Sequence, residues 1–136
     1  MKLLGIDYGD MRIGLSIGEL NIAVPFRAIQ SKTMKENVDT IAKIIIDNEI
    51  EKVVIGLPLN MNGTQGKRAK KTKAFGAVLQ KVTQKEIDYQ DERLSSISAK
   101  EKLHDINLKK NKRKDKTLTD ILSAQLILEE YLGNRN

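Results

Sequence analysis

Three acidic residues sit in unusual settings along this 136-residue chain. Asp7 follows the apolar run "LLGI" at residues 3–6, Glu92 comes just after the strand-like "EIDYQD", and Asp120 lies in the first turns of an apolar helical segment. Burying a charged side chain is costly unless the charge is paired or binds a metal. If the three side chains converge, their oxygen donors suit a hard cation, and we expect one or two Mg²⁺ or Mn²⁺ ions. Such ions activate water and stabilise the leaving oxygen in phosphodiester cleavage.

Each of these carboxylates also has a purely structural explanation, and the residues alone leave both explanations open. In the structural alternative Asp7 caps a turn, and Glu92 pairs with Arg93 or with a lysine. Asp120 is then favoured simply by the dipole at the N-terminus of its own helix. Convergence of the three side chains at one place would decide between the two explanations.

Small residues accompany two of the carboxylates. Ser123 and Ala124 share a helical face with the third carboxylate, so this face can approach the sheet closely and bring the carboxylate with it. Gly5 and Gly9 flank the first carboxylate, and we expect them to let a substrate backbone come close. Asp10 adds a further negative charge beside them, with no role that the sequence assigns.

The composition excludes several kinds of site. Without cysteine there are no disulfides and no thiolate metal sites, and a single histidine, His104, excludes a multi-histidine zinc site. The length fits one domain over residues 1–136. A net charge of +6 fits a polyanionic partner such as nucleic acid, although solubility alone also explains it. No signal peptide or long apolar run is present, so we expect a cytoplasmic protein without membrane contact.

A glycine-bearing loop and several basic residues fit contacts with a nucleic acid backbone. The segment "GLPLNMNGTQGKRAKK" at 56–71 places a loop after a parallel strand, where open α/β sheets bind ligands, and its amides and the next helix N-terminus suit phosphate. The lysine-rich stretch "KKNKRKDK" at 109–116 is predicted to be a flap that contacts the backbone, or else a solvated loop. The residues expected to bind nucleic acid are Arg12, Asn60, Arg68, Arg93, Lys110, Lys112 and Arg113.

The hydrophobic pattern predicts the elements that must position these side chains. Three strands come first, the third containing Pro25 and therefore expected at an edge, and βα units follow, which predicts a mixed five-stranded α/β sheet flanked by helices. The helix over 67–82 is expected to bury Thr72, Phe75, Val78, Leu79 and Val82. Strands are expected over 2–9, 12–20, 22–30, 52–59 and 86–92, and helices over 34–50, 67–82, 93–103 and 117–132, the last ending at Gly133.

Four motifs in this order resemble the YqgF family, also called RuvX, whose members are RNase H-like proteins similar to the RuvC resolvases. The matching pieces are "GIDYG" with "RIG", "VVIGLPLNMNGTQG" followed by Arg68, "DERLSS" and "DILSAQLILEEYL". The resemblance implies an RNase H-like fold and a metal-dependent nuclease with Asp7, Glu92 and Asp120 as catalytic acids. Related nucleases often carry a fourth carboxylate, which is absent here because Thr117 and Ser123 flank Asp120 at the neighbouring helical positions.

The resemblance also implies a substrate, because family members are described as acting on the 5′ end of pre-16S rRNA. The first alternative is a Holliday junction resolvase that cuts four-way DNA junctions and requires a symmetric dimer. The second is a module that binds nucleic acid without cleaving it. An ATPase of the actin–hexokinase type would need a second comparable domain, which 136 residues do not allow. We therefore expect a nuclease, as a monomer or homodimer, on precursor rRNA or branched DNA.

Overall fold

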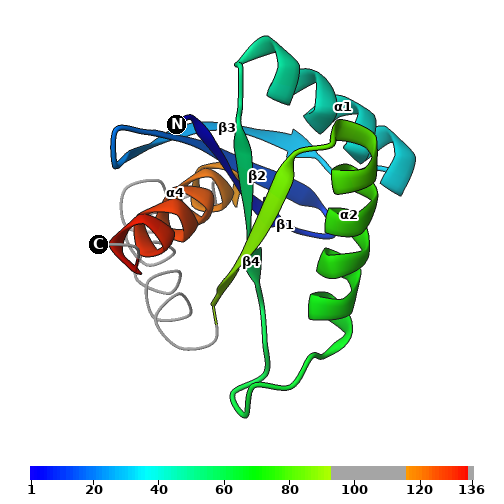
Figure 1. The fold of residues 1–136 in the computed structure, drawn as a ribbon. Helices are drawn as coiled ribbons and strands as arrows, with labels where there is room; N and C mark the ends of the chain where they lie inside the picture. The colour runs from blue at the N-terminus through cyan, green and yellow to red at the C-terminus, as the bar shows by residue number, and fades with distance from the viewer. Residues whose placement is uncertain (93–115, 135–136) are drawn as a thin grey trace.

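The sheet has five strands and is mixed, as the sequence predicts (Figure 1). A computed structural model describes residues 1–92 and 116–134. The strand order is β3-β2-β1-β4-β5, with antiparallel pairing among β1, β2 and β3 and parallel pairing of β4 with β1 and β5. The elements are β1 (Leu3–Tyr8), β2 (Arg12–Glu19), β3 (Ile22–Gln30), α1 (Met34–Asp47), β4 (Lys52–Leu57), α2 (Lys67–Thr83), β5 (Glu86–Asp91) and α4 (Lys116–Asn134).

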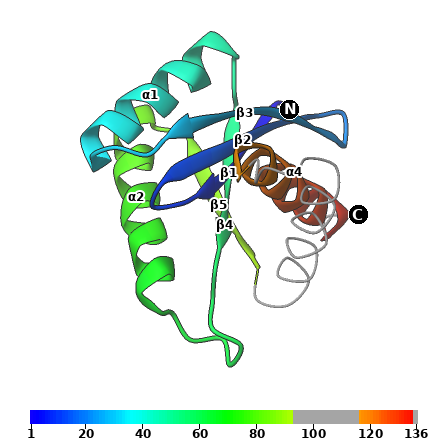
Figure 2. The same cartoon turned by 180° about the vertical axis from the view of Figure 1, so that it is seen from behind.

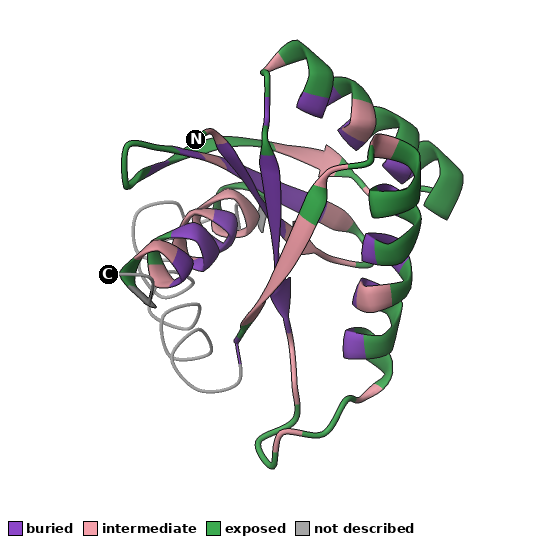
Figure 3. Cartoon of the chain, viewed as in Figure 1, coloured by how far each residue is buried: buried purple, intermediate pink, exposed green. Residues whose placement is uncertain are grey.

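Helices cover both faces of the sheet. Helices α1 and α2 lie on one face and α4 lies on the other (Figures 1 and 2). Every residue of β4 is buried, because this interior strand is covered on both sides, and this explains its largely apolar sequence. The outer surfaces of α1 and α2 are exposed (Figure 3). The helix expected over 93–103 lies outside the described residues.

Two apolar clusters correspond to the two layers. The larger one joins α1 and α2 to the sheet and contains Ile6, Ile41, Ile55 and Phe75 among others. The smaller one lies under α4, and its members are Leu3, Ala23, Val54, Ile127, Leu128 and Tyr131. Alternate residues of β1 enter different clusters, since successive side chains of a strand point to opposite faces. None of the helices within the described ranges is long and apolar enough to cross a membrane.

The helix boundaries agree with local capping, but the buried face of α2 differs from the prediction. The Thr33 side chain accepts a hydrogen bond of 3.2 Å from the backbone N–H of Glu36 and so begins α1. In α2, Val78 is 39% exposed and Val82 is 54% exposed. Thr72, Phe75 and Leu79 are buried as predicted, and the small residues Ala69 and Gly76 complete the buried face in place of the two valines. The helix can lie close to the sheet because two of these residues are small.

The edge position predicted for β3 is confirmed. Among the described residues this strand pairs only with β2, and Pro25 lies within it. The register shifts between Leu15, which is aligned with Arg27, and Ser16, which is aligned with Pro25, so that Phe26 is the extra residue of a bulge. At the other end of the chain α4 continues to Asn134, two residues past the predicted end at residue 132.

Candidate active site

Asp7 lies on the face of the sheet that α4 covers. Leu3 belongs to the cluster under α4, and a side chain added at Gly5 would meet Ala124 and Leu128 of that helix. Strand alternation therefore directs Asp7 to the same face, near the C-terminal end of β1. Asp7 is half-buried and is aligned with Gly14 of β2.

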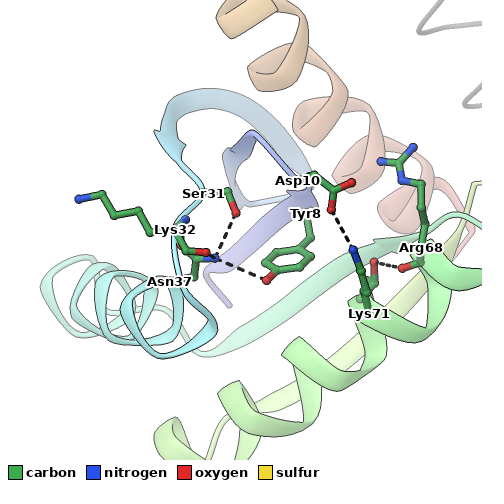
Figure 4. Close-up of polar contacts among 8 residues, drawn as sticks. Tyr8, Asp10, Ser31, Lys32, Asn37, Arg68 and Lys71 are labelled. Atoms are coloured by element: carbon green, nitrogen blue, oxygen red, sulfur yellow. Dashed lines mark hydrogen bonds and ion pairs between the residues drawn. The ribbon is translucent and has the colours of Figure 1, made fainter.

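The neighbouring residue Tyr8 fixes the end of β1 from the opposite face. Its ring stacks on Phe75 of α2 with 4.1 Å between the ring centroids. The side-chain amide of Asn37, which is buried, donates to Ser31 Oγ at 3.2 Å and to Tyr8 Oη at 3.5 Å (Figure 4). Because β1 is held here from the α1 and α2 side, the position of Asp7 on the other side is also fixed.

Glu92 extends over the same face from the end of β5. It is only 5% exposed, and its N–H donates to the carbonyl oxygen of Leu57 at 3.1 Å. A side chain added at Gly56 would overlap the Glu92 carboxylate and the side chain of Ile127 in α4. Val54 is aligned with Gly5, so Gly56 follows on the same face beside Asp7. The Glu92 carboxylate thus lies over β4 next to the end of β1.

Asp120 reaches this face from α4, five residues into the helix. Its main chain lies directly against Gly14, where an added Cβ would overlap the carbonyl oxygen of Asp120. Gly14 is aligned with Asp7, so these two carboxylates belong to neighbouring positions. The Asp120 side chain accepts a hydrogen bond from Arg12, with 2.7 Å between Nε and Oδ2.

Helix α4 comes close to glycines near Asp7, whereas the prediction was that a substrate backbone approaches Gly5 and Gly9. Helix α4 packs directly on Gly5, Gly14 and Gly56, and the Ser16 hydroxyl donates to the carbonyl oxygen of Ala124 at 2.7 Å. Gly5 is therefore covered by the chain itself, which corrects the expectation that a substrate backbone approaches there. Gly9 forms a tight turn instead, in which its N–H donates to the Arg12 carbonyl oxygen at 3.1 Å.

The three carboxylates share one face and one edge of the sheet. Their oxygen-only donor set fits a hard divalent cation, and the Glu92 side chain is buried. Within residues 1–92 and 116–134, however, no three acidic or histidine side chains lie close enough together to form a metal-binding group. Ser123, beside Asp120, donates to the Thr119 carbonyl oxygen at 2.8 Å. In this structure the Asp120 carboxylate instead contacts Arg12.

Comparison with known proteins decides the family. The sequence profile described as "RuvX: Holliday junction resolvase" matches residues 1–134. A protein of Syntrophomonas wolfei is 37% identical over 97% of this chain and 94% of its own length. A protein of Carboxydothermus hydrogenoformans is 39% identical over 100% of this chain and 99% of its own length. Both are named "Putative pre-16S rRNA nuclease". The chain belongs to the RuvX family.

Solved structures confirm the RNase H-like fold of this RuvX-family chain. RuvC of T. thermophilus in complex with a Holliday junction substrate has a TM-score of 0.60, with 16% identity, covering 99% of this chain and 95% of RuvC. The Fowlpox virus resolvase in complex with Holliday junction DNA has a TM-score of 0.63, with 14% identity, covering 99% of both chains. At such identities the likeness shows the fold alone.

Asp10, unexplained by the sequence, lies toward α2 in this RuvX-family structure. Its Oδ1 is 3.7 Å from Nζ of Lys71, and both side chains are exposed (Figure 4). An exposed ion pair of this length contributes little to stability. Asp10 is therefore separate from the three carboxylates on the face that α4 covers.

The structure describes three of the seven residues predicted to bind nucleic acid, and their surroundings differ. Asn60 holds the loop after β4, since its Nδ2 donates to Thr64 Oγ1 at 3.0 Å and its N–H donates to the Thr64 carbonyl oxygen at 2.9 Å. Arg68 is exposed in the first turn of α2. Arg12 is engaged with Asp120, as described above. Four further predicted residues, Arg93, Lys110, Lys112 and Arg113, lie outside the described residues.

The first turns of α2 carry positive charges where the helix dipole disfavours them. No acidic residue lies in the first turn, and Gly66 provides no side-chain cap. The basic residues are Lys67, Arg68, Lys70, Lys71 and Lys73. Because the N-terminus of a helix is itself positive, this arrangement costs stability and favours the binding of an anion.

A buried lysine at the other end of the sheet escaped the sequence analysis. Lys52 Nζ lies 2.9 Å from Asp88 Oδ2 and 3.6 Å from Glu86 Oε1, and the Tyr131 hydroxyl donates to Asp88. Hydrogen bonds to Asp88 and Tyr131 raise the pKa of Lys52, although burial alone would lower it. The signal in the sequence is a lysine that opens an otherwise apolar strand, with acidic residues alternating along β5.

Proposed function

We propose that this protein is a metal-dependent nuclease that processes the 5′ end of pre-16S rRNA. The observation that carries the proposal is the arrival of Asp7, Glu92 and Asp120 on one face of the sheet from three separate elements. A purely structural role for each carboxylate would not require this common location. Membership of the RuvX family and the printed names of the relatives support the same activity and substrate. Such a substrate implies action in the cytoplasm.

In the proposed mechanism the chain supplies a divalent cation site and a track for phosphates. Asp7, Glu92 and Asp120 would hold Mg²⁺ or Mn²⁺, which when bound supplies Lewis-acid stabilisation and an activated water. Glu92 is buried and held through its backbone, so it presents its carboxylate with little freedom. Arg68 and its basic neighbours on α2 would bind phosphates of the substrate backbone, because a guanidinium can donate to two phosphate oxygens at once.

Asp7→Asn tests the proposal, with Asp10→Asn as its matched control. Both changes remove one negative charge from the same turn region, but only Asp7 lies on the carboxylate face. We expect Asp7→Asn to lower cleavage of a pre-16S rRNA fragment in Mn²⁺ by at least 100-fold, while RNA affinity and the circular dichroism spectrum stay unchanged. Asp10→Asn should retain cleavage. Full activity of pure Asp7→Asn protein would overturn the assignment.

A four-way DNA junction is the second candidate substrate. Two solved structures with the same fold, RuvC of T. thermophilus and the Fowlpox virus resolvase, contain Holliday junctions. A cleavage assay offering labelled precursor rRNA and a four-way junction to one protein sample distinguishes the candidates. We expect the rRNA fragment to be cut at its 5′ side and the junction to remain intact. Symmetric cleavage of the junction alone would assign the protein to the resolvases.

A further inference from the structure

The contact between Arg12 and Asp120 joins two residues with different predicted tasks. Arg12 begins β2 and is expected to bind phosphate, whereas Asp120 is expected to bind the metal. The residues are 108 positions apart in the sequence, yet Nε donates to Oδ2 at 2.7 Å. Both side chains keep contact with solvent, at 29% and 26% exposure. The pair is therefore accessible to a ligand at the proposed site.

Such a pair is exchangeable because it is partly solvated. Ion pairs in this setting contribute up to about 1 kcal/mol, so a competing partner of either sign can replace them. A cation that binds Asp120 must compete with the guanidinium for the same carboxylate. A phosphate must likewise compete with that carboxylate for Arg12, which it can bind through two oxygens. Metal and nucleic acid thus each separate the pair.

We propose that Arg12 is a positioning residue that exchanges Asp120 for a substrate phosphate, so that binding of nucleic acid releases Asp120 for the metal. The inference rests on the proposed function. Its consequence is positive coupling, since a ligand that separates the pair makes the other ligand's binding more favourable. Coupling between two ligands is reciprocal, so Mn²⁺ also strengthens the binding of nucleic acid. Without substrate, Arg12 keeps Asp120 engaged and the metal site incomplete.

Arg12→Met removes the competition of the guanidinium for Asp120 and provides the test. Calorimetric titration with Mn²⁺, in the absence of nucleic acid, should give an affinity at least threefold higher for Arg12→Met than for the wild type. The coupling is measured separately, from the anisotropy of a labelled pre-16S RNA fragment with phosphorothioate linkages that resist cleavage. Mn²⁺ should strengthen RNA binding by the wild type several-fold more than RNA binding by the variant.

Arg27→Met is the matched control, because Arg27 is exposed on the adjacent strand β3 and its loss removes the same charge without touching Asp120. It should behave as the wild type in both measurements. Equal gains in Mn²⁺ affinity for Arg27→Met and Arg12→Met would assign the effect to overall charge and overturn the exchange. Arg12→Gln, closer in polarity to arginine, repeats the test if Arg12→Met is not folded by circular dichroism.

The proposed exchange at Arg12 and the proposed nuclease function are overturned by different results. If the wild type binds Mn²⁺ through Asp7 but Arg12→Met binds it no more tightly, the exchange is wrong and the nuclease proposal stands. If neither the wild type nor Arg12→Met binds Mn²⁺, both proposals are overturned. Undiminished coupling in Arg12→Met would also contradict the exchange, because the residue would then have no part in linking the two ligands.

Discussion

Lys52 is a buried lysine whose positive charge is balanced by acidic side chains. It lies at the end of the sheet away from the three carboxylates of the proposed site. Its ammonium group meets Asp88 and Glu86, and the Tyr131 ring centroid lies 5.5 Å from Nζ. Removing one member of such a group leaves the others without compensation, and this loss is the main source of destabilisation. Since Asp88 keeps its contact with Tyr131 and some solvent, the cost remains moderate.

We therefore expect Lys52→Met to lower the free energy of unfolding by roughly 1–3 kcal/mol at pH 7. The pKa of Lys52 is raised above its ordinary value of 10.5, so its stabilising contribution is complete below pH 10.5 and declines as pH rises further. In urea denaturation, the difference in the free energy of unfolding between variant and wild type should stay constant from pH 7 to 10.5. It should narrow from pH 10.5 to 11.5. Lys81→Met, an exposed control, should show neither effect. A difference that widens in alkali would contradict the assignment.

At the residue scale, the grouping of three carboxylates into one site stays a prediction, and the sequence did not indicate what each of them contacts. Asp7, Glu92 and Asp120 stood out because each follows or enters an apolar segment, and their elements do place them on one face. The contact of Arg12 with Asp120 was not predictable, since it joins residues 108 positions apart whose proximity depends on how α4 crosses β2. Whether these residues act on a substrate remains a prediction.

At the element scale, α4 can lie close to the sheet because glycines, which have no side chain, lie beneath it. Three strands each offer a glycine to this helix, and the main chain of Asp120 lies against one of them, Gly14. Because the contact is with backbone, no side-chain rotation can relieve an added methyl group. The helix must then move away from the sheet, and it would carry Asp120 with it.

Gly14→Ala should consequently destabilise the protein by about 1–3 kcal/mol and also reduce cleavage. The control is Gly133→Ala in the last turn of the same helix, where an added Cβ meets nothing within 4 Å. That change should leave cleavage intact and raise stability by at most about 1 kcal/mol through helix propensity. Thermal unfolding of both variants checks the contrast. A Gly14→Ala protein as stable as the wild type would show that the contact is looser than the structure indicates.

The elements themselves followed from the sequence because their patterns are strong. The continuous apolar run of β4 and the spacing of Val38, Ile41 and Ile45 in α1 left little ambiguity. The prediction for the buried face of α2 was wrong only for Val78 and Val82, because it chose large apolar residues where the packing uses Gly76 against the Tyr89 hydroxyl. Periodicity indicates that a helix has an apolar face, but the distance to the sheet determines which residues fit there.

At the scale of the whole molecule, charge is the property that bears on function. The net charge of +6 is distributed so that five basic residues crowd the beginning of α2, in opposition to the helix dipole. Binding of a polyanion to such a surface releases counterions, so affinity falls as salt rises. This dependence can be measured without knowing the sequence that is bound.

Arg68→Gln should weaken RNA binding and reduce the slope of log affinity against log salt by about 0.7, the value for one phosphate of a single strand. The same change should raise the stability of the protein by about 0.3–1 kcal/mol, because it removes a cation from a helix N-terminus. Lys81→Gln, at the other end of α2, should leave the slope unchanged and slightly lower stability. Anisotropy titrations between 50 and 200 mM salt, about a fourfold range, suffice. An unchanged slope in Arg68→Gln would remove that residue from the RNA surface.

The packing of α4 against the first two strands has a consequence for the order of events during synthesis. The first half of the proposed site leaves the ribosome early, because Asp7 and Gly14 belong to the N-terminal hairpin. A chain still being translated has neither Asp120 nor the helix that covers these glycines, and it gains them only when residues 116–134 emerge. On the proposed function, a nascent chain is therefore inactive toward ribosomal RNA until α4 has packed onto the hairpin of β1 and β2.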